Sequence, residues 1–309
     1  MAEASIPVDL FNPGQVFACL GFMEAADILL GDVEGGFDWS DAAQVRFLLK
    51  AAGDDNPFAV VLEFLAQAEV HSHAPVGYGP PPSKKKRKVP AGNSDEDASR
   101  EDRPERSETF PSPAGDRMAL PVRLKVSELP WIVLSHWSDG SRRDDFKLYG
   151  GNRSAASIAR AMLRGTFDKA QNQGVGALWR THGTQLVAKP FDLLTRVGGS
   201  FNFDPRGAWT AIDAGYSPDR QKKAGNLNGI LASPTVEILA ALGLEHARPD
   251  EYALRQVRYA AWRSVVPLSL ARPALSGANV GCVTRTFHFT FGGTKHNKVV
   301  TFAQEEIKR

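Results

Sequence analysis

Residues 282–302 read CVTRTFHFTFGGTKHNKVVTF, and this stretch indicates the fold class more directly than any other part of the chain. Val283, Arg285 and the three phenylalanines up to Phe291 alternate with small or polar residues, which is the period-two pattern of a β-strand. The pair Gly292-Gly293 and the following run 298–302 predict an antiparallel hairpin. Helical periodicity occurs elsewhere in the chain, so we predict a mixed α+β fold with antiparallel strands.

Residues 1–70 are predicted as an acidic helical segment. Residues 12–31 and 56–65 each begin with Asn-Pro, an N-cap followed by proline at the first helical position, and continue with apolar residues at helical spacing. A third helix is predicted over residues 40–53, with Ser40 as its cap. Seventy residues bury little core on their own, so we expect these helices to dock on the rest of the chain.

The remaining 239 of the 309 residues divide into two parts. Residues 71–117 contain almost no large apolar side chain and are predicted as a disordered Pro/Lys/Glu-rich insertion or linker. Residues 118–309 are predicted as a basic α+β domain. Its expected strands cover 122–126 and 131–134, and its expected helices cover 152–165 and 234–243.

Charge is distributed unevenly along the chain, although its formal net charge is only +2. Residues 1–74 hold 2 basic and 12 acidic side chains, whereas residues 118–309 hold 26 basic and 15 acidic ones. Such asymmetry is typical of proteins that bind a polyanion. The alternative is that the acidic and basic parts neutralise one another in the fold.

Several classes of protein are disfavoured. Two cysteines, Cys19 and Cys282, cannot form a disulfide scaffold or a four-cysteine zinc site. No apolar run is long enough for a membrane span, and the start lacks a signal-peptide pattern, so we expect a cytoplasmic protein.

Recognised catalytic motifs are missing, so we expect no enzyme, no metal and no cofactor. His71 and His73 are two residues apart but have no further ligands nearby. A metal-dependent nuclease using Asp144, Asp145 and His296 is the remaining catalytic alternative, and their spacing does not favour it.

Two clusters of cations with glycine and aromatic residues, at 137–153 and 196–223, predict a nucleic-acid interface in the basic domain. Glycine pairs let backbone amides approach phosphates, cations attract the backbone, and aromatic rings offer stacking faces for bases. The aromatic candidates have a second interpretation, as core residues. The predicted binding residues are Arg142, Arg143, Lys147, Asn152, Arg153, Arg206, Lys222 and Lys223, and the stacking candidates are Trp137, Phe201 and Phe203.

A third basic element lies in the insertion, where the sequence reads Lys84-Lys85-Lys86-Arg87-Lys88. Three interpretations stay open: a solvated charge run, a nucleic-acid-binding arm, and a nuclear import signal, native or engineered.

Two longer stretches carry a family resemblance. Residues 6–21 read IPVDLFNPGQVFACLG, and residues 201–209 read FNFDPRGAW and are followed by DAGYSP at 213–218. With shorter similarities at 234–243 and 262–268, they resemble the large-subunit-type component of CRISPR type I-U (I-G) effector complexes.

The resemblance implies a non-catalytic subunit of a Cascade-type ribonucleoprotein in antiviral defence. Its implied partners are a guide RNA, double-stranded target DNA, the other Cascade subunits and a helicase-nuclease. In such complexes guide pairing reads the target, so the protein needs few groove contacts and a cationic channel. The chain departs from the family in being short for a large subunit and in its lysine-rich insertion. The alternative function is a protein–protein adaptor whose basic face binds an acidic partner.

Overall fold

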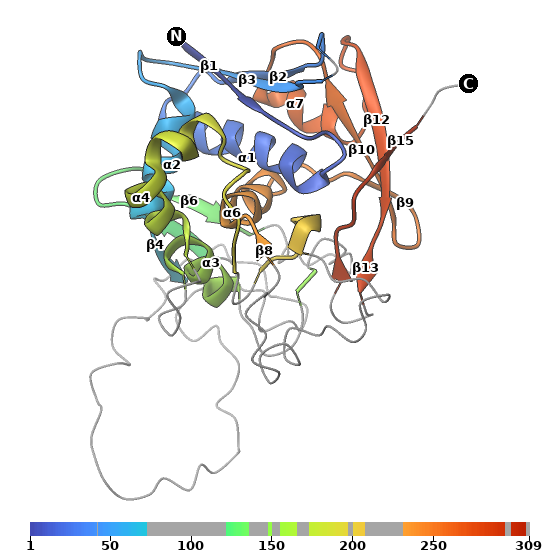
Figure 1. Ribbon diagram of the computed structural model, residues 1–309. Coiled ribbons are helices and arrows are strands. Elements are labelled where there is room, and N and C mark those ends of the chain that lie inside the picture. Colours follow the sequence, from blue (N-terminus) through green and yellow to red (C-terminus); the bar gives the residue numbers. More distant parts are fainter. Residues whose placement is uncertain are drawn as a thin grey trace, which may run out of the picture.

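The computed structural model describes residues 1–41, 43–72, 122–135, 148–149, 155–165, 173–196, 200–207, 231–293 and 298–306. These residues form a mixed α+β fold with antiparallel sheets, as predicted (Figure 1). A four-stranded sheet lies at the top of the view in Figure 1, with helices α1 and α6 beneath it and a second four-stranded sheet at its right.

The first sheet has the strand order β1 (Ala2–Pro7), β3 (Arg46–Ala51), β2 (Glu34–Asp38) and β11 (Val266–Pro267). The helix predicted over residues 40–53 is therefore wrong, because strand β3 occupies this place. Phe47, Leu49 and Ala51 are fully buried and alternate with more exposed residues. Pairing with β1 and β2 on both sides satisfies the backbone of β3 and fixes it as a central strand.

Helices α1 (Pro13–Leu29) and α2 (Pro57–Gln67) confirm the two Asn-Pro predictions. The Asn12 side chain accepts a hydrogen bond from the Gln15 backbone, and Asn56 caps α2 in the same way. Most residues of α1 are buried on all sides, so this helix lies at the centre of the core.

The second sheet has the order β15 (Gln304–Glu305), β12 (Thr284–Thr290), β10 (Gln256–Trp262) and β9 (Asp250–Ala253). Strand β12 confirms the alternating pattern at 283–291. The predicted hairpin is also present, since β13 (Gly292–Gly293) pairs with β14 (Lys298–Val299). The Phe289 ring packs against Phe17 of α1 and Tyr259 of β10, which joins the sheet to the central helix.

Helix α6 (Pro234–Gly243) was predicted correctly and packs along α1 at unusually short range. A Cβ atom added to Gly21 would lie 1.9 Å from the Leu239 carbonyl oxygen, and one added to Gly243 would lie 2.0 Å from the Phe17 carbonyl oxygen. Only glycine permits this backbone-to-backbone contact.

Helix α7 lies near the top of Figure 1 beside β2, and the other remaining elements complete its lower and left-hand parts. A third sheet of β4, β5 and β6 and helix α3 confirm predictions at 122–126, 131–134 and 152–165, whereas α4 and α7 were not predicted. The bounds are β4 (Glu69–Ser72), β5 (Val122–Lys125), β6 (Ile132–Leu134), α3 (Ala155–Arg164), α4 (Val175–Ala188), β7 (Thr195–Arg196), the short 3-10 helix η2 (Pro205–Gly207), β8 (Leu231–Ala232) and α7 (Leu268–Leu275).

The predicted insertion at 71–117 begins two residues too early, because His71 and Ser72 belong to β4. Its other residues lie outside the described part of the chain. Core residues from the N-terminal segment and from the basic part form one cluster, so the N-terminal helices dock on the rest as expected. Within the described ranges, none of the helices is long and apolar enough to cross a membrane.

Candidate nucleic-acid interface

The best-described part of the predicted interface is residues 200–207, which we call the junction segment. Asp204 lies at its centre and is 1% exposed. Its carboxylate accepts hydrogen bonds from the Ser233 backbone N–H at 2.9 Å and from Asn12 Nδ2 at 3.4 Å. Asn12 caps α1 and Ser233 caps α6, so a single carboxylate ties together the N-terminal ends of both central helices. The positive ends of the helix dipoles stabilise its charge.

A second buried carboxyl, Glu237 in the first turn of α6, holds the backbone of the junction segment. It accepts hydrogen bonds from the N–H groups of Asp204 at 2.8 Å and Phe203 at 3.3 Å. Burial raises the pKa of Glu237 to about 8, and the nearby Asp204 charge adds to this increase, while the backbone hydrogen bonds oppose it. Glu237 is therefore mainly protonated at neutral pH, next to Asp204, which is paired with Arg206.

Arg206 is the one predicted binding cation within the described ranges, and its guanidinium is directed into the junction. Nε donates to Asp204 Oδ1 at 2.9 Å, one terminal nitrogen donates to Oδ2 at 2.8 Å, and the other donates to the Phe191 carbonyl at 2.9 Å. All three nitrogens thus have partners inside the protein. Arg206 orders the junction in this structure, and phosphate binding by this residue remains a prediction.

Phe201 and Phe203 are each 1% exposed, and their rings lie 6.2 Å apart within the core. Tyr149 packs edge-on against Phe201 at 5.8 Å. The stacking role proposed for these two phenylalanines is therefore wrong for this structure, because neither ring offers a face to a base. The alternative interpretation from the sequence, that they are core residues, is the one observed.

Asn202 connects the junction segment to two other parts of the chain. Its backbone has a left-handed conformation with φ of 70°. Its side-chain amide donates to the Lys298 carbonyl at 2.9 Å and to the Leu148 carbonyl at 3.5 Å, and its own carbonyl accepts from Val300 at 3.0 Å. Leu148 follows directly after the predicted binding residue Lys147. A residue of the first cationic cluster therefore contacts the junction segment, which belongs to the second.

Strands β7 and β8 extend this convergence. Arg196, where the second cationic cluster begins, pairs with Leu231, which lies beyond the end of that cluster. In Figure 1, β8 and β13 both lie on the lower side of the fold, opposite the sheet that carries β1. Among the described residues of the clusters, Arg196 and the junction segment lie near the N-terminal end of α6.

Most of the predicted binding residues themselves lie outside the described residues. These are Arg142, Arg143, Lys147, Asn152, Arg153, Lys222 and Lys223, the stacking candidate Trp137, and the basic run Lys84, Lys85, Lys86, Arg87 and Lys88.

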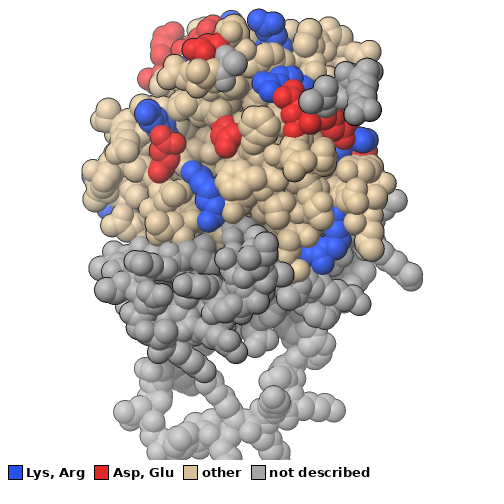
Figure 2. Space-filling model, turned by 45° about the vertical axis from the view of Figure 1, so that its right-hand side comes forward, with Lys and Arg blue, Asp and Glu red and all other residues tan. Residues whose placement is uncertain are grey.

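Several described arginines of the basic part pair with carboxylates. Arg272 reaches Glu24 of α1 at 2.7 Å, and Arg164 reaches Glu69 of β4 at 3.0 Å. Both pairs join the basic part to the acidic N-terminal segment, as the neutralisation alternative expects. On the face shown in Figure 2, Lys and Arg side chains (blue) lie next to Asp and Glu side chains (red). Positive charge is thus partly neutralised on the described surface.

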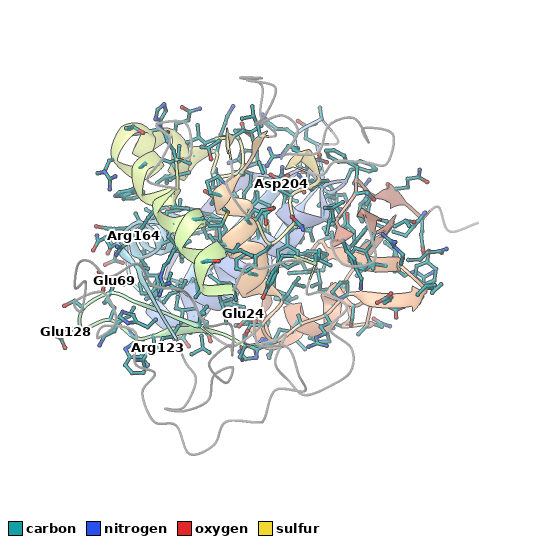
Figure 3. The ribbon with its side chains drawn as sticks, turned by 90° about the horizontal axis from the view of Figure 1, so that it is seen from below. Glu24, Glu69, Arg123, Glu128, Arg164 and Asp204 are labelled. Atoms are coloured by element: carbon teal, nitrogen blue, oxygen red, sulfur yellow. The ribbon has the colours of Figure 1, made fainter. Side chains whose placement is uncertain are left out.

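The third sheet carries cations that are not among the predicted binding residues. Arg123 of β5 lies over the Trp131 ring, with its guanidinium carbon 3.7 Å from the ring centroid, and Lys125 Nζ lies 5.2 Å from the same ring. Figure 3 shows Arg123 and Arg164 on the same side of the molecule, away from Asp204. The alternation of residues 122–126 was recognised as a strand, and the same alternation places both cations on one face of it.

The described residues contain no group of three or more His, Cys, Asp or Glu side chains placed to hold a metal ion. Cys19 is buried, and burial raises the pKa of its thiol. Asp144, Asp145 and His296 lie outside the described ranges.

Comparisons with protein-family models, with curated proteins and with solved structures found no match to this chain.

Proposed function

We propose that the chain is a non-catalytic subunit of a CRISPR type I Cascade ribonucleoprotein. It would contribute to guide-RNA-dependent recognition of target DNA and to recruitment of a helicase-nuclease, in the cytoplasm. The observation that carries the proposal is the contact between the two stretches on which the family resemblance rests. Asn12 of the first stretch bonds to Asp204 of the second, 192 residues further along the chain.

The contact continues in the backbone. A Cβ atom added to Gly14 would lie 2.4 Å from the Phe203 carbonyl oxygen, so the first turn of α1 lies directly against the junction segment. The two stretches that carry the family resemblance are packed together and form one structural unit. The proposal is therefore supported by two stretches that lie together in the structure.

The junction also provides a reason for the arrangement of charge. Asn202 of the junction segment bonds to Leu148 of the first cluster, and Asp204 bonds to Ser233, which directly follows the strand that pairs with Arg196 of the second cluster. Cations presented from one side of the fold act together on one polyanion, since their attractions to a phosphate backbone add. Guide RNA and the duplex flanking the target are polyanions of this kind.

The test uses the full chain expressed with its guide array and the neighbouring Cascade subunits. Affinity purification is expected to recover guide RNA and those subunits with the wild-type chain. A chain with Arg142, Arg143, Lys222 and Lys223 changed to alanine is expected to lose target-duplex binding. The matched control changes Lys50 of β3 and Arg263, which directly follows β10, to alanine. It should bind the target duplex as wild type does.

Two results would contradict the proposal. One is purification of the wild-type chain with neither RNA nor other Cascade subunits. The other is target binding by the four-alanine variant that equals that of the control. Recovery of an acidic protein partner without nucleic acid would support the adaptor alternative instead.

A further inference from the structure

A cleft lies between helix α4, strand β1 and the start of α2, on the left-hand side of Figure 1 and away from the junction segment. Its volume is about 640 Å³, within the range of small-molecule sites. Phe58 forms an apolar part of the lining and is fully buried. Ser5 and Asn56 add polar groups, and the side formed by α4 includes Trp179, Gly183 and Val187.

The side formed by α4 follows from the spacing of its residues. Trp179, Gly183 and Val187 are four residues apart, which places them on one face of the helix. Gly183 leaves this face open at its middle, because a Cβ atom built there would have nothing within 4 Å. The helix bends directly before this position, where His182 has non-helical backbone angles of −138° and 29°. The cleft therefore has the Trp179 ring on one side and an open space beside Gly183.

One cation is bonded to a lining residue of the cleft, and two others are sequence neighbours of lining residues. Arg46 donates from Nε to the Ser5 hydroxyl at 2.9 Å and from a terminal nitrogen to the Ser5 carbonyl at 2.7 Å, so its guanidinium is fixed at the edge formed by β1. Arg180 follows Trp179 in α4, and Lys189 follows the last residue of that helix; both are exposed. Within the described part of the chain, none of the three forms an ion pair with a carboxylate.

Asp38 of β2 lies opposite Arg46 in the strand register, and two further acidic residues lie near the Asn56 edge of the cleft. Asp54 and Asp55 are exposed in the turn that leads to Asn56. Arg46 and Ser5, at the opposite edge, supply the described donors for an anionic group. The Asn56 carbonyl oxygen already caps α2, whereas its NH₂ group has no hydrogen-bond partner among the described residues.

We propose that this cleft binds one nucleotide, with its base against Trp179 and its phosphate beside Arg46. An aromatic wall, an amide and hydroxyl at the edge of a base, and fixed cations for a phosphate are the groups that such a ligand requires. The choice of ligand rests on the proposed function, but the residues are separate from the junction segment. The nucleotide has two sources, an unpaired residue of a single strand or a free mononucleotide.

The first test fills the cleft without removing any contact. Gly183→Leu places a large side chain in the open space, while Gly183→Ala is the matched control with a small one. Both changes suit a helix better than glycine, so melting temperatures should not fall below that of wild type. Fluorescence anisotropy with labelled dT12 should show weaker binding for Gly183→Leu and wild-type binding for Gly183→Ala.

The second test removes the stacking wall. Trp179→Ala is expected to weaken dT12 binding between about 5-fold and about 150-fold, because base–aromatic stacking contributes this much per base. Trp179→Phe should restore most of the affinity. Tyr252→Ala serves as control, since this exposed ring lies beneath Arg258 but lines no part of the cleft.

Unlabelled thymidine monophosphate distinguishes the two sources. Displacement of dT12 at micromolar concentration supports a free-nucleotide site, and displacement only by oligonucleotide supports single-strand binding. Wild-type dT12 affinity in both Gly183→Leu and Trp179→Ala would overturn the cleft proposal. If these variants also keep normal duplex and guide-RNA binding, the proposed function stands without the cleft. Loss of dT12 binding in the cleft variants with no recovery of guide RNA by wild type supports the cleft and contradicts the Cascade assignment.

Discussion

Replacement of Glu237 by glutamine should change how the stability of the protein depends on pH. Glu237 is buried in the junction, and its pKa is raised from 4.5 to about 8. Between these values the unfolded chain releases the proton while the folded chain keeps it. The unfolded state is then favoured as pH rises, so stability falls through this window. Glutamine has the same shape as glutamic acid and does not titrate, so the stability of the variant lacks this fall with pH.

The expected magnitude follows from the width of the window. Each pH unit between about 4.5 and about 8 lowers the free energy of unfolding by about 1.4 kcal/mol, which amounts to about 5 kcal/mol over the whole window. The glutamine side chain can keep the 2.8 Å bond from the Asp204 N–H through its carbonyl oxygen but not the 3.3 Å bond from Phe203. This loss adds a destabilisation of about 1 kcal/mol that does not vary with pH.

The assay is urea unfolding of the full chain, followed by tryptophan fluorescence at pH 5, 6, 7 and 8. The measured quantity is the difference in unfolding free energy between Glu237→Gln and wild type, which should increase in favour of the variant at each step. Glu63→Gln, at an exposed position in α2, is the control, and its unfolding free energy should change with pH as that of wild type does. If the unfolding free energies of Glu237→Gln and wild type change equally with pH, the account of the buried carboxyl is refuted.

Three further predictions concern packing and pairing. Gly243→Ala should lower stability by about 3 kcal/mol, because its Cβ would lie 2.0 Å from a carbonyl oxygen of α1, whereas Gly183→Ala should raise it by about 0.5–1 kcal/mol. Equal melting temperatures for the two variants would contradict the close helix contact. Arg272→Ala should cost about 2–3 kcal/mol in denaturant unfolding, since it leaves Glu24 buried without its bidentate partner. A change below about 0.5 kcal/mol would show that the pair contributes little. Asn202→Ala should speed amide hydrogen exchange in β14, because the bonds that anchor this strand are lost. Unchanged exchange there would argue against the role of Asn202.

Local signals in the sequence were sufficient for several elements. The Asn-Pro pairs predicted α1 and α2 because an N-cap and a proline act within one helical turn. The alternating phenylalanines predicted β12, since a strand with one buried face needs a period of two.

Other features depend on contacts that no local pattern contains. Residues 46–51 were assigned to a helix, although Phe47, Leu49 and Ala51 also fit a period of two; pairing with β1 and β2 decides between the patterns. The alternation of Phe201 and Phe203 suggested an exposed face, but their burial depends on Tyr149, far away in the sequence. The role of Asp204 could not be foreseen either, because its partners Asn12 and Ser233 come from two distant helix ends.

The most direct test of the central claim, that the two cationic clusters bind nucleic acid, is the salt dependence of target-duplex binding. For wild type, the logarithm of the association constant should fall linearly with the logarithm of salt concentration. Changing Arg142, Arg143, Lys222 and Lys223 to alanine should make this slope shallower by about three to four, roughly one for each lost phosphate contact. An affinity of the wild-type chain that does not depend on salt, or identical slopes for the two proteins, would contradict the claim.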